Sequence, residues 1–205
     1  MIRICGLDEV GRGAFAGPLV AAAVIIKGPL SGLFENSPVP IRDSKTLSHY
    51  QRQRVATYLK KKGVKTTIET ISATEINEKG MGWANKEIFL RLIRRMKATK
   101  YVVDGHLKLF LDEKTIIESR IKADTKVPQV ILASILAKLY RDKLMTKLDR
   151  TFPQYHWKEN KGYGTQSHQL AIIQYGPTLE HRRLWLETWQ KHLPKPSLPT
   201  SSFPI

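Results

Sequence analysis

Two short apolar runs, separated by a glycine-rich turn, constrain the fold of this chain most strongly. Residues 2–7 are rich in strand-forming residues, and a longer apolar run extends from Leu19 to Ile26. Runs of this length next to Gly and Pro are typical of buried strands. We therefore expect residues 2–7 and 18–26 to pair as a central hairpin.

The rest of the chain alternates between strand and helix patterns. Residues 28–40 contain Gly, Pro, Ser and Asn, which favours a loop. The expected strands are 65–72, 100–104 and 115–122, and the expected helices are 48–62, 85–97, 128–148, 165–175 and 179–191. This order predicts an α/β fold: a mixed sheet flanked by helices, followed by a helical C-terminal part.

The charge balance points to a polyanionic partner. The 205 residues include 34 Lys and Arg against 18 Asp and Glu, a formal net charge of +16. Nucleic acid is the first candidate and an acidic membrane surface the second. No apolar run approaches the roughly 18 residues of a spanning helix. The N-terminus enters a strand-like run without a signal-peptide pattern, and the single cysteine, Cys5, excludes an internal disulfide. We therefore expect a cytoplasmic protein without a membrane partner.

Four acidic residues stand at the ends of expected elements. Asp8 and Glu9 follow the first apolar run, Asp104 closes a strand, and Asp124 precedes the long helix. Each one alone is better explained by a turn, a strand end or a helix cap. Together they suggest clustered carboxylates, which repel one another unless cations hold them. Two Mg²⁺ ions held this way could promote an in-line displacement at phosphorus, so a basic protein with such acids suggests a nuclease.

Two glycine-containing segments are candidate ligand contacts. Gly11-Arg12-Gly13 follows the acid pair, and such a segment lets the backbone approach a phosphate, although a tight turn is the plainer explanation. Tyr163 lies between two glycines in a basic loop, where it could stack on a sugar or base or pack on its own domain.

Several segments, taken together, resemble the type 2 ribonucleases H in order and spacing from residue 2 to about 183. They are GLDEVGRGAFAGPLVAAAV at 6–24, DSK at 43–45, VVDG at 102–105, KAD at 122–124, ASILAKLYRD at 133–142, NKGYGT with His168 at 160–168, and YGPTLEHRR at 175–183. The first of these motifs is long and specific. Chance is therefore an unconvincing explanation for the match.

The resemblance implies a ribonuclease H-like fold, with a five-stranded mixed sheet flanked by helices and a C-terminal helical region. It implies Mg²⁺ or Mn²⁺ as cofactor, with Asp8, Glu9, Asp104 and Asp124 as catalytic and metal-binding residues. Asp142 is a rival for the fourth acid, but it lies near the far end of the long helix from Asp124. The implied substrate-binding residues are Gly11, Arg12, Gly13, Asp43, Ser44, Lys45, Ser134, Lys138 and Tyr163. In relatives the GRG loop contacts the 2′-hydroxyl, and the tyrosine contacts the junction between RNA and DNA.

The implied activity is that of an endonuclease. It would cut the RNA strand of RNA–DNA hybrids, nick 5′ of single ribonucleotides in duplex DNA, and leave a 3′-hydroxyl and a 5′-phosphate. The alternative is a non-catalytic hybrid-binding protein on the same fold. We expect a monomer with a catalytic core at 1–150, a C-terminal helical substrate-binding region at 151–193 and a flexible proline-rich tail at 194–205.

Overall fold

The structure is a computed structural model that describes residues 3–28, 30–41 and 44–192. Asp43 and the predicted tail at 194–205 lie outside these residues. The chain divides into two compact units, each built from separate segments. Unit 1 combines the residues up to Val10 with Val20–Thr70 and Asn85–Tyr140, and unit 2 combines Gly11–Leu19, Ile71–Ala84 and the residues from Arg141 on. The predicted boundary at residue 150 remains a prediction.

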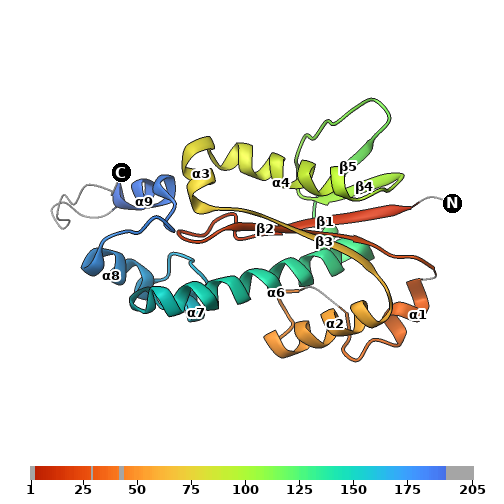
Figure 1. Ribbon diagram of the computed structural model, residues 1–205, viewed down its shortest axis with the longest axis horizontal. Coiled ribbons are helices and arrows are strands. Elements are labelled where there is room, and N and C mark those ends of the chain that lie inside the picture. The colour runs from red at the N-terminus through yellow and green to blue at the C-terminus, as the bar shows by residue number, and fades with distance from the viewer. Residues whose placement is uncertain (1–2, 29, 42–43, 193–205) are drawn as a thin grey trace. The chain divides into compact units, whose positions relative to one another are not determined.

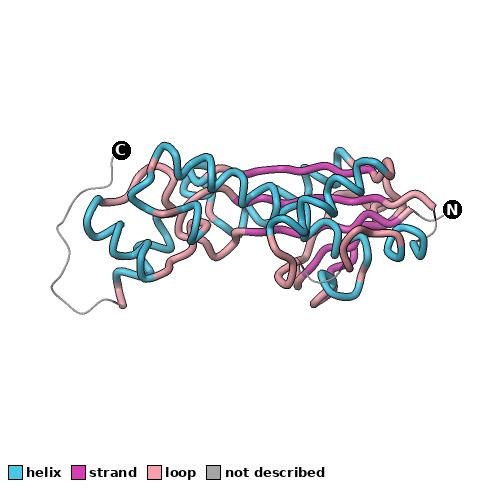
Figure 2. Tube along the Cα trace, turned by 90° about the horizontal axis from the view of Figure 1, so that it is seen from below, coloured by secondary structure: helices cyan, strands magenta, loops and turns pink. Residues whose placement is uncertain are grey.

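A five-stranded mixed sheet forms unit 1. Its strands are β1 (Ile4–Val10), β2 (Leu19–Ile25), β3 (Lys65–Ile71), β4 (Lys100–Asp104) and β5 (Ile116–Arg120), in the spatial order β3-β2-β1-β4-β5. Strand β1 pairs antiparallel with β2 and parallel with β4, and β4 pairs parallel with β5. Every residue of β2 is buried, as a strand covered on both faces requires. Figure 2 shows the strands side by side.

Helices cover both faces of this sheet, with α4 on one face and α2 and α6 on the other (Figure 1). The first half of the chain contributes α1 (Leu30–Glu35), α2 (His49–Lys61), α3 (Ala73–Lys79) and α4 (Met81–Arg95). The short α5 (Ala123–Lys126) and the long α6 (Pro128–Thr151) follow β5. Val127 and Val130 pack with Val102 of β4 in one buried cluster. Among the described helices, none is long and apolar enough to cross a membrane.

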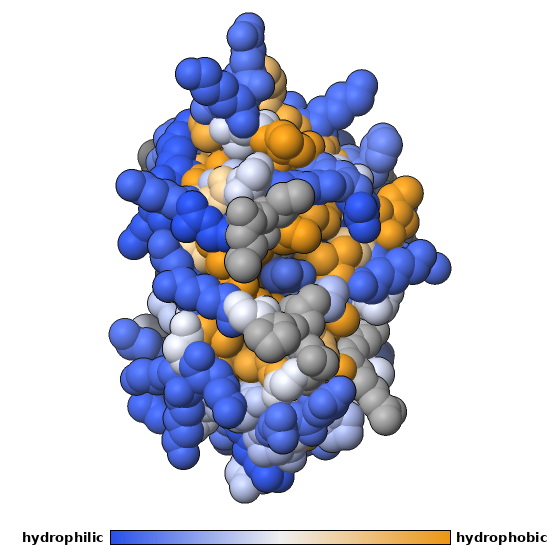
Figure 3. All heavy atoms as spheres, turned by 90° about the vertical axis from the view of Figure 1, so that its right-hand side faces the viewer, coloured by the Kyte–Doolittle hydropathy of each residue, from blue (hydrophilic) through white to orange (hydrophobic). Residues whose placement is uncertain are grey.

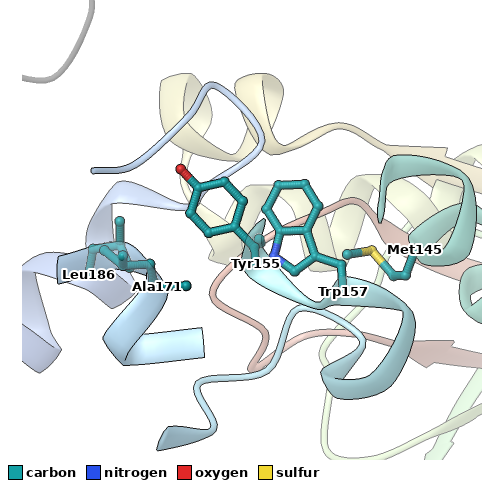
Figure 4. Packing of buried hydrophobic residues seen from close by; sticks show 7 residues of the cluster. Met145, Tyr155, Trp157, Ala171 and Leu186 are labelled. Carbon is teal, nitrogen blue, oxygen red and sulfur yellow. The ribbon is translucent and has the colours of Figure 1, made fainter. Parts of the chain in front are cut away.

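Unit 2 has its own aromatic core. Its later elements are the 3-10 turn Pro153–Tyr155 and the helices α7 (Trp157–Asn160), α8 (Gln166–Tyr175) and α9 (Arg183–Gln190). The rings of Tyr155 and Trp157 stack with centroids 5.1 Å apart. Met145 and Leu186 belong to the same buried cluster (Figure 4). The predicted helical C-terminal part is therefore present, with a core of its own.

The predicted hairpin, the five strands and the long helix are confirmed. Ser48 caps α2 with a full capping box, as expected from its position before that helix. The prediction of a loop over 28–40 was wrong in part, because α1 lies inside it. Helix α3 was missed, although Ser72 and Glu75 form a capping box whose spacing is visible in the sequence.

Gly6 allows β1 and α6 to approach closely, and this yields a stability prediction. A Cβ at Gly6 would lie 2.3 Å from the carbonyl carbon of Gln129 and 2.4 Å from the nitrogen of Val130. Since backbone atoms cannot move aside cheaply, Gly6→Ala should lower the free energy of unfolding by about 1–3 kcal/mol. Urea denaturation would measure the change. Gly82→Ala is the control, because a Cβ there meets nothing within 4 Å, and equal losses in the two variants would contradict the prediction.

Candidate active site

Asp8 lies on the central strand of unit 1, next to the strand that carries Asp104. The parallel register pairs Leu7 with Val103, so the next residues along the two strands are Asp8 and Asp104. Strand β1 continues to Val10, which corrects the expectation that the acid pair follows the strand. Asp8 is only 6% exposed. The sheet therefore brings two of the predicted acids to neighbouring positions.

A hydroxyl chain supports Asp8. The Ser134 hydroxyl of α6 bonds the Asp8 carboxylate, and the Oγ atoms of Ser134 and Ser44 lie 2.7 Å apart. When Asp8 is ionised it can only accept, so Ser134 donates to it and Ser44 donates to Ser134. Both serines are buried. Their predicted contact with substrate remains a prediction, and what the structure gives them is a role in holding Asp8.

The environment of Asp8 disfavours its ionised form. Burial raises the pKa of Asp8 well above its usual value, and the charges of Glu9 and Asp104 raise it further. The Ser134 hydrogen bond opposes this rise only in part. A bound cation would relieve both the burial cost and the repulsion, because it would favour the ionised carboxylate.

The Asp104 side chain is hydrogen-bonded to the backbone at the start of α5, where Asp124 lies. One carboxylate oxygen of Asp104 accepts from the Ala123 N–H at 2.6 Å and from the Asp124 N–H at 3.3 Å. Asp124 is 7% exposed, and its Oδ2 lies 3.3 Å from Nζ of Lys45. The exposed Lys45 ammonium therefore neutralises part of the negative charge here. Asp142 is assigned to unit 2, and the choice of Asp124 as the fourth acid remains a prediction.

Glu9 is half-buried. It pairs with Ala21 of β2, directly next to the pair formed by Asp8 and Ala22. Successive residues of a regular strand point to opposite faces, yet the charge of Glu9 is, after burial, the largest cause of the raised pKa of Asp8. Within residues 3–28, 30–41 and 44–192, no three His, Cys, Asp or Glu side chains are arranged to hold a metal ion. The carboxylates near Asp8 nevertheless fit a hard divalent cation in chemistry, since they offer oxygen ligands and excess negative charge.

In unit 2, the predicted substrate-binding segment forms a tight turn. Gly11 is buried with φ at +89°, whereas Arg12 and Gly13 are exposed. The half-buried Tyr163 belongs to a loop with Gly162 at φ +77°. The Arg141 guanidinium lies 5.5 Å from the centre of the Tyr163 ring. Of the predicted substrate contacts in unit 2, Arg12 and Gly13 are thus exposed and Tyr163 is half-buried. Lys138, which belongs to unit 1, is also half-buried.

Two buried arginines and two buried histidines of unit 2 were not predicted as functional. Arg141 and Arg182 are both 0% exposed and donate to main-chain carbonyls around the turn. Trp157 Nε1 donates to His168 Nε2 at 2.9 Å, and His181 Nε2 lies 3.2 Å from the same atom. Thr178 N–H donates to Nδ1 of His181, so Nε2 of that ring carries the hydrogen. All four lie in segments that carry the family resemblance, but their spacing does not indicate that they form this network.

The family model for ribonuclease HII matches residues 5–192. The chain belongs to this family. Three comparisons agree with the assignment. The ribonuclease HII of Clostridium perfringens strain 13 is 38% identical over 187 residues, which cover 90% of this chain and 66% of that protein. The ribonuclease HII of Aliarcobacter butzleri strain RM4018 is 38% identical over 184 residues, covering 89% of this chain and 90% of the relative.

A solved structure supports the ribonuclease H-like fold of this ribonuclease HII family member. The crystal structure of ribonuclease H2 from Pyrococcus horikoshii OT3 matches with a TM-score of 0.74 and 27% sequence identity, covering 93% of this chain and 96% of that chain. The chain spans just under two thirds of the length of the Clostridium perfringens relative. The sequence-based resemblance and the expected fold class are thus confirmed.

Proposed function

We propose that this chain is a metal-dependent endonuclease. It would hydrolyse the RNA strand of RNA–DNA hybrids and nick 5′ of single ribonucleotides in duplex DNA, leaving a 3′-hydroxyl and a 5′-phosphate. Membership of the ribonuclease HII family supports the proposal. The observation that carries it is the buried Asp8 carboxylate, held beside Asp104 in a chain whose net charge is +16. Negative charge gathered in so basic a protein is most simply explained by cations that carry out chemistry at phosphates.

The acids of unit 1 would form the catalytic centre. Asp8, Glu9, Asp104 and Asp124 would hold Mg²⁺ or Mn²⁺. When bound, two such ions supply an activated water and neutralise charge on the leaving oxygen. Ser134 would keep Asp8 in place, since its hydroxyl bonds that carboxylate. Lys45 and Lys138 would bind substrate phosphates without sequence preference.

Unit 2 would recognise the ribonucleotide. The main-chain N–H groups of the turn at 11–13 would bond the 2′-hydroxyl, the group that distinguishes RNA from DNA. Tyr163 would pack on the neighbouring deoxyribose, where the missing hydroxyl leaves room for a ring. The remaining Lys and Arg would bind the backbone, which makes affinity depend strongly on salt. Figure 3 views the right-hand side of Figure 1, where α1, β4 and β5 of unit 1 lie, and hydrophilic side chains project there around hydrophobic patches.

The test uses labelled duplexes of three kinds: DNA with one ribonucleotide, a continuous RNA–DNA hybrid, and all-DNA. We expect a nick immediately 5′ of the single ribonucleotide with Mg²⁺ or Mn²⁺ and none with EDTA. Cleavage of the continuous hybrid alone would remove the roles proposed for the turn at 11–13 and for Tyr163. Tight hybrid binding without any cleavage would favour the alternative of a non-catalytic binder. A monomeric state and a cytoplasmic location remain predictions, to be checked by light scattering and by cell fractionation.

A further inference from the structure

Arg182 binds three main-chain carbonyls of the segment that contains the turn. Its Nη1 donates to the oxygens of Gly11 at 2.6 Å and Arg12 at 3.0 Å, and its Nε donates to that of Gly17 at 3.0 Å. The backbone N–H of Arg182 also donates to Phe15 O at 2.7 Å. One side chain thus fixes both ends of the segment from residue 11 to residue 17.

Arg141 joins the same segment to the loop of Tyr163. Its Nε donates to Pro18 O at 3.0 Å and its Nη2 to Ala16 O at 3.0 Å, while its Nη1 donates to Lys161 O at 2.7 Å. The same guanidinium lies over the Tyr163 ring. The backbone adds to this link, since Phe15 N and Ala16 N both donate to Gly162 O.

These bonds determine which way the turn presents its N–H groups. In a trans peptide the N–H points away from the carbonyl of the same peptide plane. The carbonyls of Gly11 and Arg12 face Arg182, so the N–H groups of Arg12 and Gly13 face the opposite way. Neither of these two N–H groups donates to an acceptor in the described part of the chain. Two donors are therefore left directed outward for a ligand.

Gly11 is necessary for this packing. A Cβ there would lie 2.1 Å from Nε of Arg141, and the φ of +89° disfavours any other residue. At Gly13, by contrast, a Cβ would meet nothing within 4 Å. The turn is thus closely packed against Arg141 at Gly11 and free of close neighbours at Gly13.

We propose that Arg141 and Arg182 are positioning residues that preform the ribonucleotide-recognition surface. They would act through the backbone of residues 11–18 and through the Tyr163 ring, without touching substrate. This inference rests on the function proposed above. Within that function, the two arginines set the preference for an isolated ribonucleotide, whereas the acids of unit 1 set the rate of cleavage.

Only arginine has the geometry that this role needs. Its planar fork donates to several carbonyls at once, whereas a lysine ammonium is a compact point charge on a flexible stem. Burial costs are high: they lower the pKa of Arg182 to about 9, with Arg141 contributing. Nη2 of Arg182 is buried without a hydrogen-bond partner among the described atoms. Core packing alone does not explain why two charged side chains are buried at this cost and bonded to a segment whose residues Arg12 and Gly13 are exposed.

The test compares Arg141→Lys and Arg182→Lys with the control Arg150→Lys, an exposed arginine on α6. In a continuous hybrid every RNA nucleotide carries a 2′-hydroxyl, so a displaced turn can still bond one of these groups. A duplex with a single ribonucleotide carries only one 2′-hydroxyl. We expect kcat/KM on the single-ribonucleotide duplex to fall at least about tenfold in the two buried variants. On the continuous hybrid, kcat should stay within about threefold, and the control should match the wild type on both.

Equal losses on both duplexes, or no loss on either, would overturn the inference. Wild-type protein that cuts neither duplex would instead remove the proposed function itself. If the buried variants do not fold, NMR on the wild-type protein provides the second measurement. The Nε–H signals of Arg141 and Arg182 should exchange slowly in the free protein and keep their shifts when the duplex binds, while the amides of Arg12 and Gly13 shift. Fast exchange of the two Nε–H groups would contradict a preformed support.

Discussion

Replacing Asp8 with asparagine should abolish cleavage and stabilise the metal-free protein at the same time. The loss of activity is expected to be at least about 1,000-fold in kcat, because the substitution removes a charged ligand from the proposed metal site. The gain in stability follows from the raised pKa of Asp8 in the folded state. Because the folded state holds the Asp8 proton more tightly than the unfolded chain does, this carboxyl group opposes folding near neutral pH, and asparagine, which does not ionise, removes that cost.

Two measurements on the same sample test this prediction: cleavage of the single-ribonucleotide duplex, and thermal unfolding in EDTA. Asp112→Asn is the matched control, since Asp112 is an exposed acid of unit 1 that accepts from Thr115 and Lys114. We expect the control to cleave normally. A lower unfolding temperature for Asp8→Asn would show that Asp8 supports the fold, and retained cleavage would remove Asp8 from the catalytic centre.

Acidification should destabilise unit 2 through His181. Burial, with the neighbouring His168, lowers the pKa of His181 from 6.5 to about 3. The unfolded chain therefore takes up a proton on this ring at a higher pH than the folded protein does. The stability contributed by the neutral ring is complete above about pH 6.5 and is lost as the pH falls toward 3. Between about pH 7 and about pH 5 the loss from this single group is about 2 kcal/mol.

The hydrogen-bond network explains why the ring resists protonation. Nδ1 of His181 accepts from the Thr178 N–H, and Nε2 faces His168. A proton added at Nδ1 would meet a donor, and burial would leave the charge without water. Denaturant unfolding at several pH values should give a flatter pH dependence for His181→Gln than for the wild type. His106→Gln, at an exposed position, should leave the wild-type slope unchanged, and an unchanged slope in His181→Gln would disprove the assignment.

Local patterns in the sequence were sufficient to predict the strands of the central sheet, whereas the role of its acids remains a prediction. The runs around β1 and β2 have strand length and apolar composition, and Asp104 ends a strand whose pattern is equally clear. The register that brings Asp8 beside Asp104 could not be derived, because strand pairing depends on contacts between distant segments. The Lys45–Asp124 ion pair spans 79 residues and is invisible for the same reason.

The side chains that support the turn at residues 11–13 were even harder to predict from the sequence. Arg141 and Arg182 donate to main-chain carbonyls, which every residue possesses, so no complementary side chain marks the partner. Both arginines are buried, whereas arginine side chains are usually exposed, so the sequence did not indicate their burial. The sequence pattern of α6 is apolar, and it predicted the helix correctly while giving no sign of what its residue 141 binds.

The length of chain between Arg182 and Gly11 has a consequence for biosynthesis. Their hydrogen bond joins residues 171 positions apart, and Arg141 reaches Ala16 across 125. Contacts this distant form late, because a long loop must close before they contribute any stability. During synthesis, the turn at residues 11–13 therefore emerges from the ribosome well before its partner Arg182. Until Arg182 has emerged and folded against it, the turn lacks the hydrogen bonds that hold the carbonyls of Gly11, Arg12 and Gly17 in place.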